Sequence, residues 1–277
     1  RELGDVDLVS IDSMQVYRGM DIGTAKPTPA ERYEIPHHLL DLDDPTTEFT
    51  VADFRDAYAA ALGRIGQAGR RALLVGGTGL YHRVVIDDFD LPGQWPAIRS
   101  ELEADEHTAA LFERLQRLDP AATAKIEPGN RRRIIRALEV TMGSGRPFSS
   151  FGPGVDDYPP SDVEQIGLRW PREVISTRIV DRVQRMIDDG LVAEVRAHAE
   201  VGLSRTAAQA LGYKEILAML DGQMSQDEAI STLITRTRQF AVRQERWFRR
   251  DPRVRWINIE HDAVAEATPA VVAALTT

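Results

Sequence analysis

The feature that most constrains the fold is a pair of short apolar segments that flank an amphipathic helix. The first segment, residues 6–11, ends at Asp12, and the second, residues 71–75, ends in the turn Gly-Gly-Thr-Gly at 76–79. Between them, one helical stripe carries Val51, Phe54, Tyr58, Ala61, Leu62 and Ile65. Strand, helix and strand in this order predict a βαβ unit and therefore a parallel sheet.

Composition excludes several classes of protein. The 277 residues include no cysteine, which rules out disulfides, thiolate catalysis and cysteine-based zinc sites. No apolar run is long enough for a membrane span, and the first residues have no signal-peptide core. We expect a cytoplasmic enzyme with one large and one smaller domain.

The sequence changes character after Asp87-Asp88. Residues 91–145 are charged and have helical patterns separated by prolines, which mark helix boundaries. They are predicted to form a helical insertion domain. Residues 1–90 and 146–277 are predicted to form the α/β core, with a strand at 165–170, helices to about Arg250 and a last strand at 254–259. The first of these helices carries Ile179, Val183, Met186, Ile187 and Leu191 on one face.

Charge is unevenly distributed. The net charge of −9 argues against a nucleic-acid partner, but residues 236–255 contain eight arginines against Glu245 and Asp251. A second cluster places four arginines within residues 131–136. Such patches attract a polyanion over roughly 10 Å in ~0.1 M salt. The alternative for either run is an ordinary solvated helix face.

Asp12 and Thr78 follow the two predicted strands and should face one crevice, because ligands of open α/β sheets bind beyond the carboxyl ends of the strands. Asp12 has two possible functions, as a ligand of Mg²⁺ or as a general base. Thr78 can offer its hydroxyl and backbone amides to an anion. The structural alternatives are an aspartate that caps the following loop and a tight turn at the strand exit.

No Walker loop of the form G-x4-G-K-[ST] is present. Residues 19–26 come nearest, but three residues separate the glycines and Lys26 lies too far along the chain. The turn at 76–79 is followed by no lysine. A doubly wound sheet usually opens with a strand, a glycine-rich loop and a helix. This sequence starts at what resembles the end of that first helix.

The sequence resembles the tRNA dimethylallyltransferases of bacteria over nearly its whole length. The matching runs occur in the family's order and are DSMQVY (12–17), IGTAKP (22–27), PHHLLD (36–41), VGGTGLY (75–81), RALEV (136–140), GYKE (212–215) and RQERWFR (243–249).

The resemblance implies a P-loop NTPase-like parallel sheet flanked by helices. It also implies transfer of a dimethylallyl group from dimethylallyl diphosphate to N6 of the adenine on the 3′ side of the anticodon, position 37. Asp12 then takes the role of general base, Thr78 lies near the diphosphate and Arg182 contacts it. Mg²⁺ is the implied cofactor, although no resident metal ligands are expected within this chain, and His37 and His38 are not expected to bind a metal.

The implied partner is the tRNA anticodon stem-loop, bound by a monomer. Gln15 suits a base edge, and Arg132, Arg133 and Arg136 suit backbone phosphates. The residues that resemble the family's tRNA-facing segments are Asp12, Ser13, Met14, Gln15, Thr78, Arg99, Arg132, Arg133, Ile134, Ile135, Arg136, Gln209, Ala210, Leu211, Gly212, Tyr213, Lys214, Val242, Arg243, Gln244, Glu245, Arg246, Trp247, Phe248 and Arg249. Trp247 and Phe248 have helical spacing and are interpreted as core residues.

Two departures from the family pattern matter. Val242 stands where the family usually has a lysine, which removes one phosphate contact. The family's P-loop, which should bind the diphosphate and Mg²⁺, is absent from the sequence, so the chain alone is expected to be inactive. Other functions compatible with the residues are a P-loop kinase or NTPase, an adenylate isopentenyltransferase and a non-catalytic RNA-binding protein.

Overall fold

The computed structural model describes residues 3–87, 89, 91–151 and 157–276. The chain forms two compact units, one made of Arg1–Asp87 with Pro160–Thr277 and the other of Asp88–Pro159. The first unit is an α/β structure and the second is helical. Each unit is described by itself.

The predicted βαβ unit is confirmed. Strand β1 (Val6–Ile11) pairs in parallel with β3 (Arg71–Gly76), and helix α2 (Val51–Gln67) connects them. The register pairs Val6 with Arg71 and Ile11 with Gly76, so the two strands end level. The short strand β2 (His37–His38) pairs with the other edge of β1 and follows helix α1 (Pro29–Glu34).

Helix α2 begins where its sequence provides a cap and buries the stripe that the sequence predicts. The Thr50 hydroxyl accepts a hydrogen bond from Asp53 N, and the Asp53 carboxylate accepts one from Thr50 N, which satisfies two backbone donors of the first turn. Phe54 is fully buried and stacks on Tyr81 of helix α3 (Gly79–Asp87), with ring centroids 4.1 Å apart. This contact fixes α3 directly after the β3 turn.

The two later strands are present as predicted, and β4 (Gln165–Arg169) pairs in parallel with β5 (Val254–Asn258) in a second sheet that the sequence did not predict. Helix α12 (Ala263–Thr276) follows β5 and packs against β4. The sequence patterns did not predict α12, which contains Pro269 and consists mostly of alanine and valine without a clear polar face.

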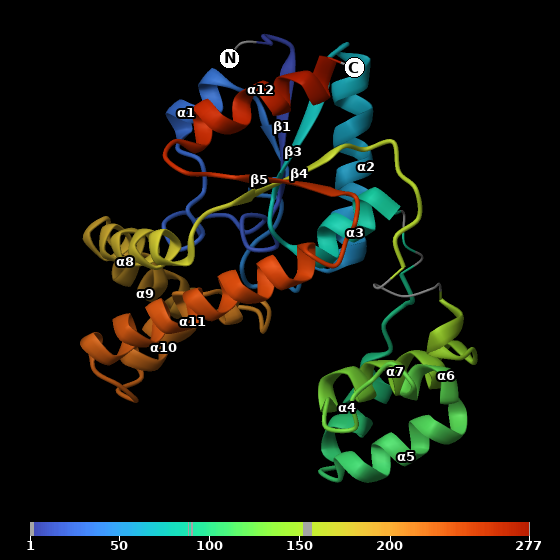
Figure 1. Ribbon diagram of the computed structural model, residues 1–277. Helices are drawn as coiled ribbons and strands as arrows, with labels where there is room; N and C mark the ends of the chain where they lie inside the picture. Colours follow the sequence, from blue (N-terminus) through green and yellow to red (C-terminus); the bar gives the residue numbers. More distant parts are fainter. Residues whose placement is uncertain (1–2, 88, 90, 152–156, 277) are drawn as a thin grey trace. The chain divides into compact units, whose positions relative to one another are not determined.

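Four further α-helices belong to the described part of the first unit, together with the 3₁₀ turn Ala207–Gln209: α8 (Arg172–Asp188), α9 (Leu191–Val201), α10 (Tyr213–Leu220) and α11 (Gln226–Phe248). They pack against one another and lie side by side in Figure 1. The prediction that Leu191 belongs to the first of these helices was wrong. Gly190 adopts φ +102°, a left-handed conformation that ends α8, and Leu191 starts α9.

The second unit consists of α4 (Pro96–Ala104), α5 (Thr108–Leu118), α6 (Pro120–Thr123), α7 (Arg131–Ser144) and the 3₁₀ turn Phe148–Ser150. Its own core includes Leu102, Leu111, Leu115, Ile134 and Leu138. Across the part of the chain that the structure describes, none of the helices is long and apolar enough to cross a membrane.

A buried ion cluster joins the end of α3 to the start of β5. Arg253 contacts Asp87 at 2.6 Å and Asp251 at 2.7 Å, and Arg83 also pairs with Asp87. Burial alone would raise the pKa of both carboxyls, but hydrogen bonds from the arginines outweigh it and hold each pKa below its ordinary value. The two arginines and two aspartates of this cluster therefore pair with one another in place of the water that would otherwise solvate their charges.

We expect Arg253→Met to lower the free energy of unfolding at pH 7 by roughly 3 kcal/mol, because it leaves buried carboxylates short of a partner. A depressed folded-state pKa gives stability that is present above the unfolded pKa of 3.8 and is lost as the pH falls through the folded value. The difference between wild type and variant should therefore shrink below about pH 3.5. Urea unfolding from pH 7 to pH 2.5 measures this, and a difference independent of pH would contradict it.

Candidate functional site

The pairing of β1 with β3 brings together the loops that follow the two strands. Ser13 N donates to Thr78 Oγ1 at 3.1 Å, and Thr78 Oγ1 donates to Ser13 Oγ at 3.4 Å. Thr78 N also donates to the carbonyl of Ile11 at 3.3 Å. Asp12 and Thr78 therefore share one edge of the sheet, as the strand order predicts.

Asp12 uses one of its carboxylate oxygens to shape the loop that follows. Oδ1 accepts hydrogen bonds from Met14 N at 2.8 Å and Gln15 N at 3.3 Å, which is the capping arrangement considered as a structural alternative. Among the described residues, Oδ2 accepts no hydrogen bond. One oxygen thus fixes the side chain to the loop that follows β1.

Arg182 of α8 is the third residue of the predicted site. Its side chain is exposed at the surface, while partial burial of the guanidinium lowers the pKa of that group and the Asp12 carboxylate acts in the opposite direction. Arg182 lines a cavity of about 550 Å³ together with Arg185 and Met186 of the same helix. Residues of the 21–29 loop also line it, together with the carboxylates of Asp41 and Asp189. The cavity therefore carries both arginine and aspartate side chains, and Asp12 and Thr78 are not part of its lining.

The glycines of the 76–79 turn allow helix α11 to lie directly against it. A Cβ atom on Gly77 would stand 1.8 Å from Gln244 Nε2, and one on Gly79 would stand 2.3 Å from Trp247 Nε1. Gln244 Nε2 donates to the Gly77 carbonyl at 3.1 Å, and the Phe248 ring meets His82 edge to face at 5.1 Å. Trp247 and Phe248 thus make packing contacts within the first unit, but both are half-buried and neither belongs to its core.

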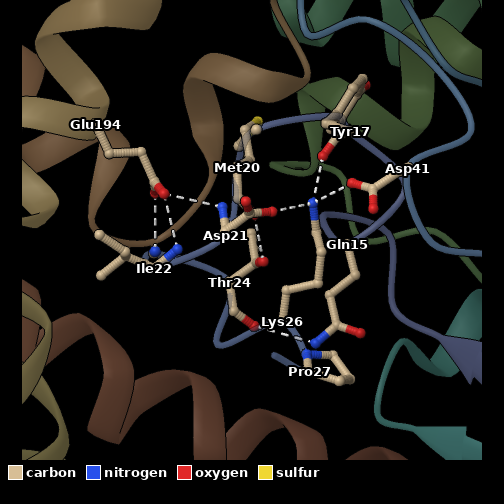
Figure 2. A network of polar contacts seen from close by, with 12 residues as sticks. Gln15, Tyr17, Met20, Asp21, Ile22, Thr24, Lys26, Pro27, Asp41 and Glu194 are labelled. Atoms are coloured by element: carbon tan, nitrogen blue, oxygen red, sulfur yellow. Dashed lines mark hydrogen bonds and ion pairs between the residues drawn. The ribbon is translucent and has the colours of Figure 1, made fainter. Parts of the chain in front are cut away.

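The buried side chain of Lys26 stabilises the loop at residues 19–26, the segment that comes nearest to a Walker motif (Figure 2). The Lys26 side chain is fully buried, and its Nζ contacts Tyr17 O, Asp41 Oδ1 and Asp21 Oδ1, each at 2.7 Å. These three acceptors match the three protons of the ammonium group. Lys26 is therefore a structural residue of the loop, and its charge is already compensated within the chain.

Comparison with known proteins identifies the family. Residues 15–251 match the family model described as IPP transferase. The tRNA dimethylallyltransferase of Pseudarthrobacter chlorophenolicus is 48% identical over 269 residues, which cover 95% of this chain and 89% of that protein. The enzyme of the same name from Kineococcus radiotolerans is 49% identical, over 91% of this chain and 80% of that protein.

The chain belongs to the IPP transferase family.

Solved structures of relatives agree with the observed architecture. The tRNA isopentenylpyrophosphate transferase of Bacillus halodurans superimposes with a TM-score of 0.71 at 38% identity, over 99% of this chain and 90% of that one. A eukaryotic dimethylallyltransferase, described as acting on tRNA, gives a TM-score of 0.80 at 22% identity and supports the fold alone. The chain has the P-loop NTPase-like α/β fold of these transferases.

In this IPP transferase family member, the amide of Gln15 is already engaged inside the first unit. Its Nε2 donates to the carbonyls of Thr24 at 3.2 Å and Ala25 at 3.3 Å, and its Oε1 accepts from the Ser10 hydroxyl at 2.8 Å. A direct contact between this amide and a base edge would require these bonds to open. The observed geometry makes Gln15 a link between β1 and the 24–25 turn.

The segment 209–214 is largely internal. Ala210 is 3% exposed and Tyr213 is fully buried, so neither side chain is accessible to RNA in this conformation. Lys214 Nζ donates to Gln209 Oε1 at 3.0 Å at the surface. Polar contacts between this segment and an RNA are therefore limited to the side chains of Gln209 and Lys214 and to the backbone.

The second unit separates its arginines into two groups. Arg132 and Arg133 are exposed, whereas Ile134 and Ile135 belong to the core of that unit. Arg136 donates to the carbonyl oxygens of Pro92 at 2.8 Å and Gly93 at 3.0 Å. Arg132 and Arg133 are thus the accessible cations of the 131–136 cluster, and Arg136 anchors the segment before α4.

Glu139 is a further residue of this unit that the sequence patterns did not single out. It is 1% exposed and accepts hydrogen bonds from Trp95 N at 2.9 Å and Arg99 NH1 at 3.3 Å, beside an ion pair with Arg136 at 3.2 Å. One buried carboxylate therefore sets the positions of two predicted tRNA-facing arginines. Its position three residues after Arg136 on one helix face was the available signal.

Helix α11 exposes the other basic surface. Arg243, Arg246 and Arg249 are exposed, as is Val242, while Glu245 forms an ion pair with Arg169 at 3.5 Å. These arginines lie on the helix whose Gln244 and Trp247 contact the glycine turn. The same helix thus joins a basic surface to the strand-end site.

The donor set at the strand ends fits Mg²⁺ held mainly by a substrate. Within the described ranges, no three His, Cys, Asp or Glu side chains gather as a metal site. Mg²⁺ commonly binds through one or two carboxylates together with substrate phosphates. Asp12, with the Ser13 and Thr78 hydroxyls beside it, is the group of oxygen donors that would meet such an ion.

We expect Gly76→Ala to destabilise the protein by roughly 2 kcal/mol, because a Cβ on Gly76 would stand 2.2 Å from the Ile11 carbonyl oxygen and push β3 away from β1. Gly63→Ala is the matched control, since nothing lies within 4 Å of a Cβ there on the exposed face of α2. The control should be neutral or stabilising by up to about 1 kcal/mol. Urea unfolding compares the two, and equal stabilities would contradict the tight strand contact.

Proposed function

We propose that the chain is a tRNA dimethylallyltransferase, which transfers the dimethylallyl group of dimethylallyl diphosphate to N6 of the adenine at position 37, next to the anticodon. The observation that carries the proposal is the hydrogen bond from Ser13 N to Thr78 Oγ1, which joins the loop that begins at Asp12 to the loop after the adjacent strand, in a chain whose relatives bear that name. We further propose that the enzyme acts in the cytoplasm and as a monomer.

The chemistry requires a base and a stabilised leaving group. The N6 lone pair of adenine is delocalised into the ring, so removal of an N6 proton as the N–C bond forms assists the reaction. Asp12 accepts that proton on Oδ2, because Oδ1 is committed to the loop backbone. The C–O bond to the diphosphate breaks, and the electron pair leaves with the diphosphate. General-base assistance of this kind contributes about 10²–10⁴-fold.

The leaving diphosphate needs positive charge and hydrogen-bond donors. Arg182 supplies a guanidinium beside the cavity, and Thr78 supplies a hydroxyl at the strand end. Bound Mg²⁺ supplies further charge neutralisation of the diphosphate. A Walker-type phosphate loop is the remaining expected component, and the 277 residues contain none.

Recognition of tRNA is proposed to depend on the exposed arginines of two surfaces. On the second unit, Arg132 and Arg133 contact phosphates. On the first unit, the contacts come from Arg243 and Arg246 of α11 and from Arg249 at its C-terminal end. Guanidinium groups pair well with phosphate oxygens, and each contact releases condensed counterions. The target base leaves its stack before reaction, at a cost of a few kcal/mol.

The function is tested by mass spectrometry of tRNA incubated with the gene's full-length product and dimethylallyl diphosphate. We expect a prenylated adenine, and we expect Asp12→Asn to lower kcat by about 10²–10⁴-fold while tRNA affinity is retained. Asparagine keeps the Oδ1 cap and removes only the base.

Asp56→Asn, at an exposed carboxylate of α2, is the control and should leave kcat unchanged. Near-normal turnover by Asp12→Asn would exclude Asp12 as the base. ATP hydrolysis without a prenylated product would favour a P-loop kinase or NTPase, and prenylation of free adenylate in place of tRNA would favour an adenylate isopentenyltransferase.

The phosphate contacts predict a change in salt dependence. Neutralising Arg132 and Arg133 to glutamine should lower the slope of log affinity for tRNA against log salt by about one unit for each contact. Arg117→Gln, at the end of α5 in the same unit, is the control and should leave the slope unchanged. Binding titrations over a range of salt concentrations measure the slopes. Identical slopes for wild type and the Arg132/Arg133 variant would place RNA elsewhere.

A further inference from the structure

The loop after β1 presents three consecutive backbone amides to a single carboxylate (Figure 2). Glu194 Oε2 accepts from Asp21 N at 3.0 Å and Ile22 N at 2.8 Å, and Oε1 accepts from Gly23 N at 3.0 Å. Successive N–H groups that converge in this way form an anion-binding concavity. Here the anion is a side chain of α9, more than 170 residues away in sequence.

Further contacts from α9 and α10 hold the same loop. The Tyr213 hydroxyl donates to Glu194 Oε1 at 2.6 Å, which gives the carboxylate a fourth donor. His198, one helical turn after Glu194, donates from Nε2 to the Gly19 carbonyl at 2.9 Å. A Cβ on Gly23 would stand 2.6 Å from the Tyr213 ring, so the loop lies directly on this surface.

The other side of the loop contacts Gln15. The Thr24 and Ala25 carbonyls accept both protons of the Gln15 side-chain amide, and Gln15 N donates in turn to Asp12 Oδ1. A continuous series of hydrogen bonds and backbone therefore runs from Glu194 through the loop and Gln15 to Asp12. These contacts are sufficient to connect the position of Glu194 with the position of the Asp12 carboxylate.

We propose that Glu194 is a positioning residue of the reaction: it fixes the loop at residues 19–26, and the loop holds Gln15 and the Asp12 carboxylate in their catalytic geometry. This inference rests on the proposed function. Glutamine at position 194 replaces one acceptor oxygen with an NH₂ group, which would face backbone donors. The loop then loses acceptors and the negative charge at this position, while the size and fold of α9 are retained.

The kinetic test uses the gene's full-length product with tRNA and dimethylallyl diphosphate. Glu194→Gln should lower kcat by about 10- to 100-fold, because small misplacements of a reacting group have effects of this size. KM for dimethylallyl diphosphate should change by less than about two-fold, since the lost interaction acts on the transition state. Tyr213→Phe removes one donor of four and should have a smaller effect. Glu200→Gln, at an exposed position of the same helix, should have none.

A double-mutant cycle tests the route through Gln15. If Glu194 acts through the loop and Gln15, Glu194→Gln should slow the Gln15→Ala enzyme little further, because the two changes interrupt one series of contacts. Independent multiplication of the two effects would overturn this route. Wild-type kcat in Glu194→Gln would overturn the positioning role.

Hydrogen–deuterium exchange tests the anchor without catalysis. In Glu194→Gln the amides of residues 21–23 should exchange faster, while those of β1 and β3 keep their wild-type rates and the melting temperature changes little. Unchanged exchange at residues 21–23 would overturn the proposed anchor. A wild-type protein that yields no prenylated adenine would refute the proposed function, and the exchange rates would still decide whether Glu194 anchors the loop.

Discussion

The parallel pairing of β1 with β3 is the interaction on which the candidate site depends. Because the register matches Ile11 with Gly76, the two strands end level and their following loops emerge together. The Thr78 hydroxyl then reaches the Ser13 amide, and the Asp12 carboxylate is held at the same edge. A shift of the strands by one residue would turn each side chain to the opposite face and separate these groups.

Close packing of backbone around this edge explains the run of glycines. Gly76 lies against the backbone of Ile11, while Gly77 and Gly79 lie against Gln244 and Trp247 of α11. The helix that exposes arginines to solvent thus touches the turn that carries Thr78. The motifs at 75–81 and 243–249 are more than 160 residues apart in sequence but are in direct contact, since the carbonyl of Gly77 accepts a hydrogen bond from Gln244.

Polar groups near the site are mostly engaged with one another, which makes the loops rigid. Lys26 satisfies its three protons on Tyr17, Asp21 and Asp41, and Glu194 accepts four hydrogen bonds. Unpaired buried charges are costly, so such networks define a single arrangement when each member has a partner. Among the described residues, the Asp12 Oδ2 atom and the Arg182 guanidinium have no hydrogen-bond partner, which agrees with the roles proposed for them as base and diphosphate contact.

The sequence by itself determined the βαβ unit, the strands at 165–170 and 254–259, and the position of Asp12 and Thr78 at strand ends. These features follow from periodicity and turn chemistry, which act over a few residues. It did not determine the α8–α9 break at Gly190, helix α12, or the partners of Gln15, Lys26 and Glu139. Tertiary structure alone decided that Glu194 accepts from Asp21, 173 residues away, because hydrogen bonds between distant segments depend on how the chain packs and leave no local pattern.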